Sequence, residues 1–196
     1  MKLIVATNNK GKLEEFKDSL SGLDIELLSI SDIDKNINIE ENGSTYEENA
    51  LIKARALCKL TNEICLGDDS GLEIEAMKGE LGVYTARFMG SDTPHSEKID
   101  EVLRRMKGLP LEERRATFRC VLALCYPDGR EKLFEGRKEG YISEEPLGTG
   151  FGFDPIFYLP DYNKTYGEIG MQEKNKISHR GIALTQFKEH LLENSK

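Results

Sequence analysis

The segment LIVATNNKGKLEEF, residues 3–16, takes the chain from a strand pattern to a helix pattern without a long linker. An apolar run at 3–6 is followed by a short polar loop, and Leu13, Phe16 and Leu20 then recur at the spacing of an amphipathic helix. A strand that feeds directly into a helix is the first half of a βα unit, so this opening favours an α/β fold. The loop carries a threonine, two asparagines and two lysines, which raises the question of what these side chains bind.

Strand and helix patterns alternate along the chain, with one hairpin in the middle. Strands are predicted at 2–6, 25–30, 64–67, 116–126, 131–142 and 156–159, and helices at 12–21, 45–61, 94–107 and 178–193. The sequence Ser44-Thr45-Tyr46-Glu47 fits a capping box for the second helix, and Pro127-Asp128-Gly129 is a turn signal between two strands. We therefore expect a single α/β domain, residues 1–196, with a mixed sheet.

The composition excludes some classes of protein. The 196 residues carry 35 acidic and 27 basic side chains, a net charge of −8, which opposes binding to nucleic acid or to an anionic membrane surface. No apolar run approaches the roughly 20 residues that cross a bilayer, and there is no signal-peptide layout, so a cytoplasmic protein is expected. The four cysteines lack C-x-x-C spacing and are expected to be small buried thiols. Because there are only three histidines, a hard metal ion held by oxygen, such as Mg²⁺, is favoured.

The opening loop has the features of an anion site. A strand-to-helix turn points the unpaired N–H groups of the first helical turn outward, with the positive end of the helix dipole behind them. Thr7 and Asn9 can donate, Lys12 supplies a charge, and Gly11 allows close approach of the backbone. The loop lacks the glycine and the Ser/Thr of a Walker A motif. The alternative is an ordinary polar turn with surface lysines.

Two acidic pairs are candidates for metal binding. Glu40 and Glu41 lie in a polar loop before the second helix, and Asp68 and Asp69 end the strand predicted at 64–67. Crowded carboxylates repel unless a cation joins them, and Mg²⁺ prefers one or two carboxylates together with phosphate oxygens and water. A carboxylate that the metal leaves unoccupied could orient or deprotonate a water. The alternative is that an aspartate only caps a turn at Gly71.

The glycine-rich segment GTGFGFDPIF, residues 148–157, could hold a flat heterocycle. Phe151 or Phe153 offers a ring face for stacking, and Asp154 offers an acceptor for N–H groups of the ring. The segment is followed by a strand and not by a helix, which argues against a dinucleotide fingerprint. The alternative is a glycine-rich turn with two core phenylalanines.

The start of the last predicted helix carries two cationic or donor side chains. His179 and Arg180 follow Ser178, and either could donate to a carbonyl oxygen on a base, with Lys174 as a further positive contact. Cations are unfavourable at a helix N-terminus, so their presence there hints at a function. The alternative is a cap at Ser178 followed by a solvated first turn.

Taken in order, these motifs resemble the inosine/xanthosine triphosphate pyrophosphatase family, whose members remove non-canonical purine nucleotides. The similarity runs nearly from end to end of the chain. Its motifs are Thr7-x-Asn9-x-x-Lys12, EENG…ENA…KA (40–54), GDDSGLEI (67–74), ARFMG (86–90), GTGFGFDPIF (148–157) and EKNKISHRG (173–181).

The resemblance implies a reaction and a fold. The reaction is Mg²⁺-dependent hydrolysis of a purine nucleoside triphosphate such as ITP, dITP or XTP to the monophosphate and pyrophosphate. The fold is α/β, with an elongated mixed sheet, flanking helices and two lobes around a central cleft, and members are usually homodimers. A nucleoside triphosphate and a second copy of the chain are the expected partners.

The resemblance also implies roles for individual residues. Those that look like triphosphate contacts are Thr7, Asn8, Asn9, Lys10, Gly11, Lys12 and Ser70. Asp69 is similar to the family's general base and metal ligand, Asp68 lies beside it, and one of Glu40 and Glu41 is the second metal ligand. The residues that correspond to base or substrate contacts are Phe151, Gly152, Phe153, Asp154, Lys174, His179 and Arg180. Many bacterial members have GTGGFGYDP, whereas this chain has GTGFGFDP, one glycine shorter and with Phe153 in place of tyrosine.

Two other functions use the same residues. The first is a non-catalytic nucleotide-binding module, although a polyanion binder gains little from four nearby carboxylates. The second is a related phosphatase that prefers another base or cleaves another bond. The pyrophosphatase hypothesis requires the cationic turn and the aspartates to meet, through a divalent ion, on a single polyphosphate.

Overall fold

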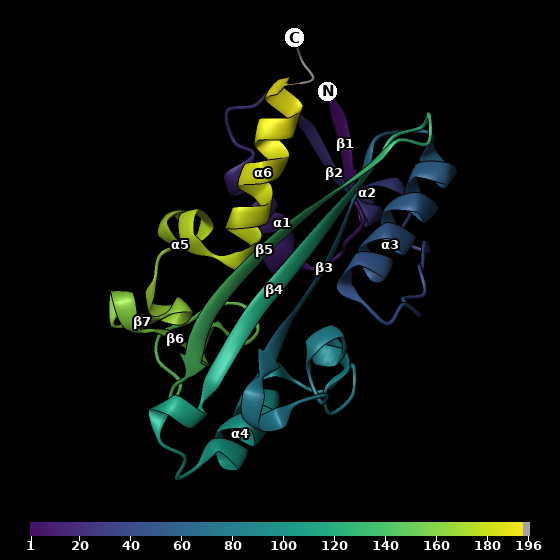
Figure 1. The fold of residues 1–196 in the computed structure, drawn as a ribbon. Coiled ribbons are helices and arrows are strands. Elements are labelled where there is room, and N and C mark those ends of the chain that lie inside the picture. The colour runs from purple at the N-terminus through teal and green to yellow at the C-terminus, as the bar shows by residue number, and fades with distance from the viewer. Residues whose placement is uncertain (194–196) are drawn as a thin grey trace. The chain divides into compact units, whose positions relative to one another are not determined.

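The computed structural model describes residues 1–193. These residues form a seven-stranded sheet and the helices that flank it (Figure 1). The strands are β1 Lys2–Val5, β2 Glu26–Ser29, β3 Cys65–Ile74, β4 Arg115–Cys125, β5 Glu131–Ile142, β6 Phe157–Leu159 and β7 Lys164–Thr165. The α-helices are α1 Lys10–Ser19, α2 Ile30–Ile33, α3 Tyr46–Thr61, α4 His95–Met106, α5 Met171–Ile177 and α6 His179–Glu193. Within this described range, no helix combines the length and apolar character needed to cross a membrane.

The sheet mixes parallel and antiparallel pairs in the order β2-β1-β3-β4-β5-β6-β7. Strand β1 runs parallel to β2, with Lys2 opposite Glu26, and parallel to β3, with Ile4 opposite Cys65. Strand β6 is antiparallel to both β5 and β7. The predicted α/β class with a mixed sheet is therefore confirmed.

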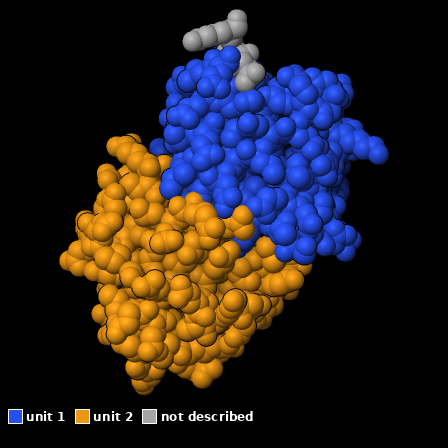
Figure 2. All heavy atoms as spheres, viewed as in Figure 1, with its two compact units in different colours: residues 1–69, 120–136, 179–196 blue, residues 70–119, 137–178 orange. Residues whose placement is uncertain are grey.

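The chain divides into two compact units (Figure 2). Unit 1 contains residues 1–69, 120–136 and 179–196, and unit 2 contains residues 70–119 and 137–178. Strands β3, β4 and β5 each contribute residues to both units. The single domain with two lobes remains a prediction.

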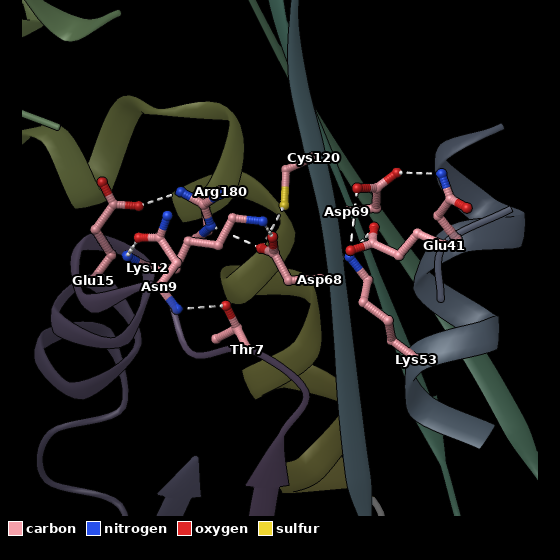
Figure 3. A network of polar contacts seen from close by, with 11 residues as sticks. Thr7, Asn9, Lys12, Glu15, Glu41, Lys53, Asp68, Asp69, Cys120 and Arg180 are labelled. Atoms are coloured by element: carbon pink, nitrogen blue, oxygen red, sulfur yellow. Dashed lines mark hydrogen bonds and ion pairs between the residues drawn. The ribbon is translucent and has the colours of Figure 1, made fainter. Parts of the chain in front are cut away.

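The core of unit 1 lies between its strands and the helices that cover them. Phe16 of α1 and Phe187 of α6 pack against alternate strand residues such as Leu3, Val5 and Leu66. Helix α3 covers the other face, as Figures 1 and 3 show. A Cβ atom on Gly67 would lie 2.0 Å from the Ala50 carbonyl oxygen, so glycine is required where α3 meets β3.

Unit 2 has a separate core. Its buried residues include Ile99, Val102 and Met106 on one face of α4, together with Phe157 of β6. The i, i+3, i+7 spacing of these residues is that of an apolar stripe on one face of a helix. Phe153 also belongs to this core and is only 2% exposed.

The structure corrects two local predictions. Strand β3 does not end at Gly67 but continues to Ile74, so Asp68 and Asp69 lie inside a strand and not after one. The cap of α3 is one residue later than predicted: Thr45 accepts from the Glu48 N–H at 3.1 Å, and Ser44 donates to the Glu48 carboxylate. Helices α2 and α5 and the short strand β7 were not predicted.

Candidate active site

The opening loop is fixed by its own side chains. Asn9 caps α1, because its Oδ1 accepts from the Lys12 N–H at 3.1 Å, and the Asn9 N–H donates to the Thr7 Oγ1 at 3.1 Å. Asn8 accepts from both the backbone and the hydroxyl of Ser31. The loop therefore presents a preformed helix N-terminus, with Lys10 exposed beside it.

Lys12 is not a surface lysine. Its ammonium pairs with the carboxylate of Asp68, which is fully buried in β3 (Figure 3). The other Asp68 oxygen accepts from Arg180 Nε at 2.8 Å and from the Cys120 thiol at 3.3 Å. Arg180, only 1% exposed, also donates to Glu15 of α1. We call Asp68, Lys12, Arg180, Cys120 and Glu15 the Asp68 network.

Charges inside this network shift one another's pKa values. Burial alone would raise the pKa of Asp68, but the nearby Arg180 and Lys12 outweigh burial and hold that pKa well below its ordinary value. Burial would lower the pKa of Arg180, yet Asp68 and Glu15 raise it. Burial, followed by the charge of Asp68, raises the pKa of Cys120. Asp68 and Arg180 therefore each favour the charged form of the other.

Asp69 faces the opposite side of β3, because successive side chains of a strand alternate (Figure 3). Its carboxylate accepts from Asn49 Nδ2 at 3.2 Å and lies 3.5 Å from Lys53 Nζ, both on α3. The same Lys53 ammonium donates to Glu41 Oε2 at 2.7 Å. Asn49 Oδ1 accepts from the Gly43 N–H at 2.8 Å and so joins the loop before α3 to this group. Asp69, Asn49, Lys53 and Glu41 are called the Asp69 network below.

The environment of Asp69 differs from that of its neighbour. Burial raises the pKa of Asp69, Lys53 and Lys12 oppose this change, and Glu41 adds to it, so the pKa lies above its ordinary value. Lys53, Lys12 and Asn49 thus compensate Asp69 less completely than Arg180 and Lys12 compensate Asp68.

The donor set of the Asp69 network fits an open magnesium site. Two carboxylates, Asp69 and Glu41, already share one cation, the Lys53 ammonium. No cluster of three or more His, Cys, Asp or Glu side chains suited to a metal occurs among the described residues. Two carboxylates with the remaining positions left to water and phosphate oxygens are the arrangement that Mg²⁺ prefers. Glu40 is exposed and has no place in this pair.

The predicted base loop lies in unit 2, and its two phenylalanines differ in burial. Phe153 is buried in the core, whereas Phe151 is only partly buried. The Asp154 carboxylate accepts from the Phe151 N–H at 3.0 Å and from Lys174 Nζ at 2.6 Å, and both charged side chains are buried. The structure thus brings together Phe151 and Asp154 of this loop and Lys174, which the sequence nominated separately as a further positive contact.

The other predicted residues have definite places. Ser70 follows Asp69 in β3 and is half-buried. His179 and Arg180 start α6, but they are buried and do not form the solvated turn of the alternative hypothesis. A Cβ atom on Gly136 of β5 would lie 1.9 Å from the His179 carbonyl oxygen, so glycine allows α6 to begin against the strand.

Sequence reasoning gave no role to four residues of these networks. Asn49 and Lys53 are four apart on α3 and share the face of Ala50 and Ala54, a signal that was available. Glu15 and Cys120 had no such signal, because their partners lie far along the chain. All four cysteines are buried free thiols, as predicted.

The model of the Ham1 family matches residues 3–190 of this chain. The chain belongs to the Ham1 family. A relative in Bacillus subtilis named dITP/XTP pyrophosphatase is 46% identical over 189 residues, which cover 96% of each chain. The structure of a Staphylococcus aureus Ham1 protein has a TM-score of 0.86 at 37% identity and covers 100% of both chains. That of a Coxiella burnetii HAM1 protein has a TM-score of 0.87 at 40% identity and covers 98% of this chain and 99% of its own.

The sequence motifs and the family match cover the same part of the chain. The motifs that carried the resemblance lie between residues 7 and 181, inside the matched range 3–190. The mixed sheet of this Ham1 chain is also the fold of the two solved Ham1 proteins.

Proposed function

We propose that this chain hydrolyses non-canonical purine nucleoside triphosphates, namely ITP, dITP and XTP, to the nucleoside monophosphate and pyrophosphate. The observation that carries this proposal is the near-full-length similarity to relatives named dITP/XTP pyrophosphatase, at 44% and 46% identity. The buried carboxylates beside a cationic helix N-terminus supply chemistry that suits the reaction.

The opening loop binds the triphosphate in this proposal. Backbone N–H groups at the start of α1 donate to phosphate oxygens, and Lys10 and Lys12 contribute charge. The residues assigned here by resemblance are Thr7, Asn8, Asn9, Lys10, Gly11, Lys12 and Ser70. Asp68, which is itself paired with Arg180, pairs with Lys12 and so fixes the position of its ammonium.

Asp69 is the general base. Its carboxylate takes a proton from a water as the water oxygen attacks the α-phosphorus, and the bond between that phosphorus and the oxygen of the leaving pyrophosphate breaks. Asn49 orients the carboxylate, and Lys53 compensates its charge. Preorganised donors of this kind supply much of the stabilisation in phosphoryl transfer.

Magnesium is the proposed cofactor, and Asp69 and Glu41 are the residues that would hold it. When bound, Mg²⁺ would neutralise charge on the phosphates. Glu41 is chosen over Glu40 because only Glu41 shares a cation with Asp69. Asp68 is a weaker candidate, since Lys12, Arg180 and Cys120 already engage its oxygens.

Base recognition is assigned by resemblance to the glycine-rich loop and to the His179-Arg180 pair. Phe151 is the proposed stacking ring because Phe153 is in the core. The assignment of His179 and Arg180 to the purine 6-oxo group rests on the resemblance. An adenine amino group there would leave a buried donor unpaired, at about 1–3 kcal/mol.

A homodimer and a cytoplasmic location complete the proposal, and both rest on the resemblance. Light scattering on the purified chain tests the first. A mass of about one 22.1 kDa chain would contradict it.

The decisive experiment is a panel of ITP, dITP, XTP, ATP and GTP, assayed separately for pyrophosphate and orthophosphate. We expect pyrophosphate from the first three with Mg²⁺ and none with EDTA. Orthophosphate as the first product would favour the related phosphatase. Binding of ITP without any product would favour the nucleotide-binding module.

A further inference from the structure

Helix α4 begins with His95, a residue that none of the sequence motifs includes. Its imidazole lies against the glycine-rich loop of the same unit. The ring centroid is 6.4 Å from that of Phe151 at an interplanar angle of 73°, and 6.0 Å from that of Phe153 at 85°. Both are edge-to-face contacts, the geometry that aromatic pairs favour.

The loop backbone does not by itself fix these rings. Gly148, Gly150 and Gly152 have φ values of 72°, 156° and 63°, conformations that glycine adopts without strain. A Cβ atom on Gly152 would lie 3.9 Å from His95 Cε1, so the imidazole covers the loop at this glycine. Hydrogen bonds such as that from the Phe151 N–H to Asp154 hold the loop backbone, so the orientation of the rings depends on their side-chain contacts.

The two phenylalanines are held differently. Phe153 is anchored in the core of unit 2 and needs no further support. Phe151 is half-buried, and the ring contacts described for it are His95 and the Lys174 ammonium, 5.9 Å from its centroid. The Lys174 ammonium is itself fixed by Asp154 at 2.6 Å. His95 is thus the aromatic neighbour that sets the angle of the Phe151 ring.

We propose that His95 is a positioning residue for base recognition, which holds the Phe151 ring at the angle needed to stack on a purine. This inference rests on the proposed function and adds to it a residue of α4. Loss of solvation, followed by the charge of Lys98, lowers the pKa of His95, which favours the neutral ring. A neutral imidazole packs against phenylalanine as an aromatic ring and carries no charge to the phosphates.

The test compares His95→Ala with His95→Phe, which restores an aromatic ring, and with Ser96→Ala, an exposed neighbour on α4. We expect His95→Ala to raise KM for ITP about fivefold, the loss of an aromatic contact, while kcat stays within about twofold. His95→Phe and Ser96→Ala should have KM values close to that of the wild-type chain. Thermal unfolding of each variant shows whether it is folded.

Inorganic tripolyphosphate is a probe that lacks a base. Its inhibition constant should be the same for the wild-type chain and for His95→Ala, because His95 acts on the base alone. An unchanged KM in His95→Ala, no rescue by His95→Phe, or a parallel loss of tripolyphosphate inhibition would each overturn the inference. If the wild-type chain is active on ITP, such a result leaves the proposed function intact; if that chain releases no pyrophosphate, both proposals fail.

Discussion

Asp68 and Asp69 are neighbours in the chain, yet their carboxylates lie in opposite electrostatic environments. Asp68 has Lys12, Arg180 and a thiol around it, and its pKa is lowered. Asp69 has one lysine, one amide and a second carboxylate nearby, and its pKa is raised. The alternation of side chains along β3 sends the two residues to different helices.

This difference suits the two aspartates to two roles, a fixed structural charge and a reactive carboxylate, which the sequence motif alone does not distinguish. A fully compensated carboxylate is a fixed charge, suited to holding Lys12 and Arg180 in place. A carboxylate with fewer donors keeps oxygen lone pairs available for a water or a metal ion. We therefore propose a structural role for Asp68 and a chemical role for Asp69.

The largest expected effect comes from Asp69→Asn. The amide has the same shape but cannot accept the proton, so turnover of ITP should fall by a factor of about 10²–10⁴. The measurement is pyrophosphate release, with circular dichroism to show that the variant is folded. A rate near that of the wild-type chain would remove Asp69 from the mechanism.

Arg180→Met tests the other half of the comparison. It leaves Asp68 and Glu15 buried without their guanidinium partner, and breaking a buried pair in this way typically costs about 3–5 kcal/mol. We expect a loss of this size in the free energy of unfolding, measured in urea.

Lys53→Met is the matched control for Arg180→Met, because it removes the cation of the Asp69 network. The Glu41 side chain is 37% exposed and can return to water, so the loss of stability should be smaller. Equal losses from the two variants would show that the networks do not differ in the way proposed.

Much of this architecture was predictable from local patterns, but the strand that carries both aspartates was predicted too short. Gly67 and the two aspartates look like the end of a strand, since strands are depleted in these residues. The strand continues because Arg180, 112 positions later, compensates Asp68, and because Gly67 allows α3 to pack closely. Local patterns do not contain such long-range contacts.

The candidate site shows the same limit. Lys12 was nominated from the strand-to-helix turn, and the resemblance singled out Asp69 from its acidic pair. The spacing of Asn49 and Lys53 on α3 was visible but unused. The choices between Glu40 and Glu41 and between Phe151 and Phe153 needed burial and contacts, which neighbouring letters do not determine.

Glu41→Gln and Glu40→Gln sharpen the assignment of the metal ligand within the Asp69 network. Both remove one negative charge from adjacent residues, but only Glu41 shares a cation with Asp69. We expect Glu41→Gln to weaken Mg²⁺ binding by about tenfold or more, measured by calorimetric titration. Glu40→Gln should bind Mg²⁺ like the wild-type chain, and the reverse ranking would make Glu40 the ligand.

The smallest expected effect comes from Glu101, whose pKa is lowered although the group is not fully buried. Hydrogen bonds from Arg104 and Arg105 lower the pKa of Glu101 on α4 to about 2, yet this group remains partly exposed, whereas Asp68 is fully buried. A folded pKa below the unfolded value contributes stability above roughly pH 4.5, and that contribution is lost as pH falls toward about 2. Glu101→Gln should therefore lower the thermal midpoint only slightly at pH 7. A salt concentration of 1 M should remove the difference, because the Debye length is then about 3 Å and charge pairs near the surface are screened. A large shift that persists in salt would mean that exposure does not distinguish Glu101 from Asp68, and the contrast drawn from burial would then need another cause.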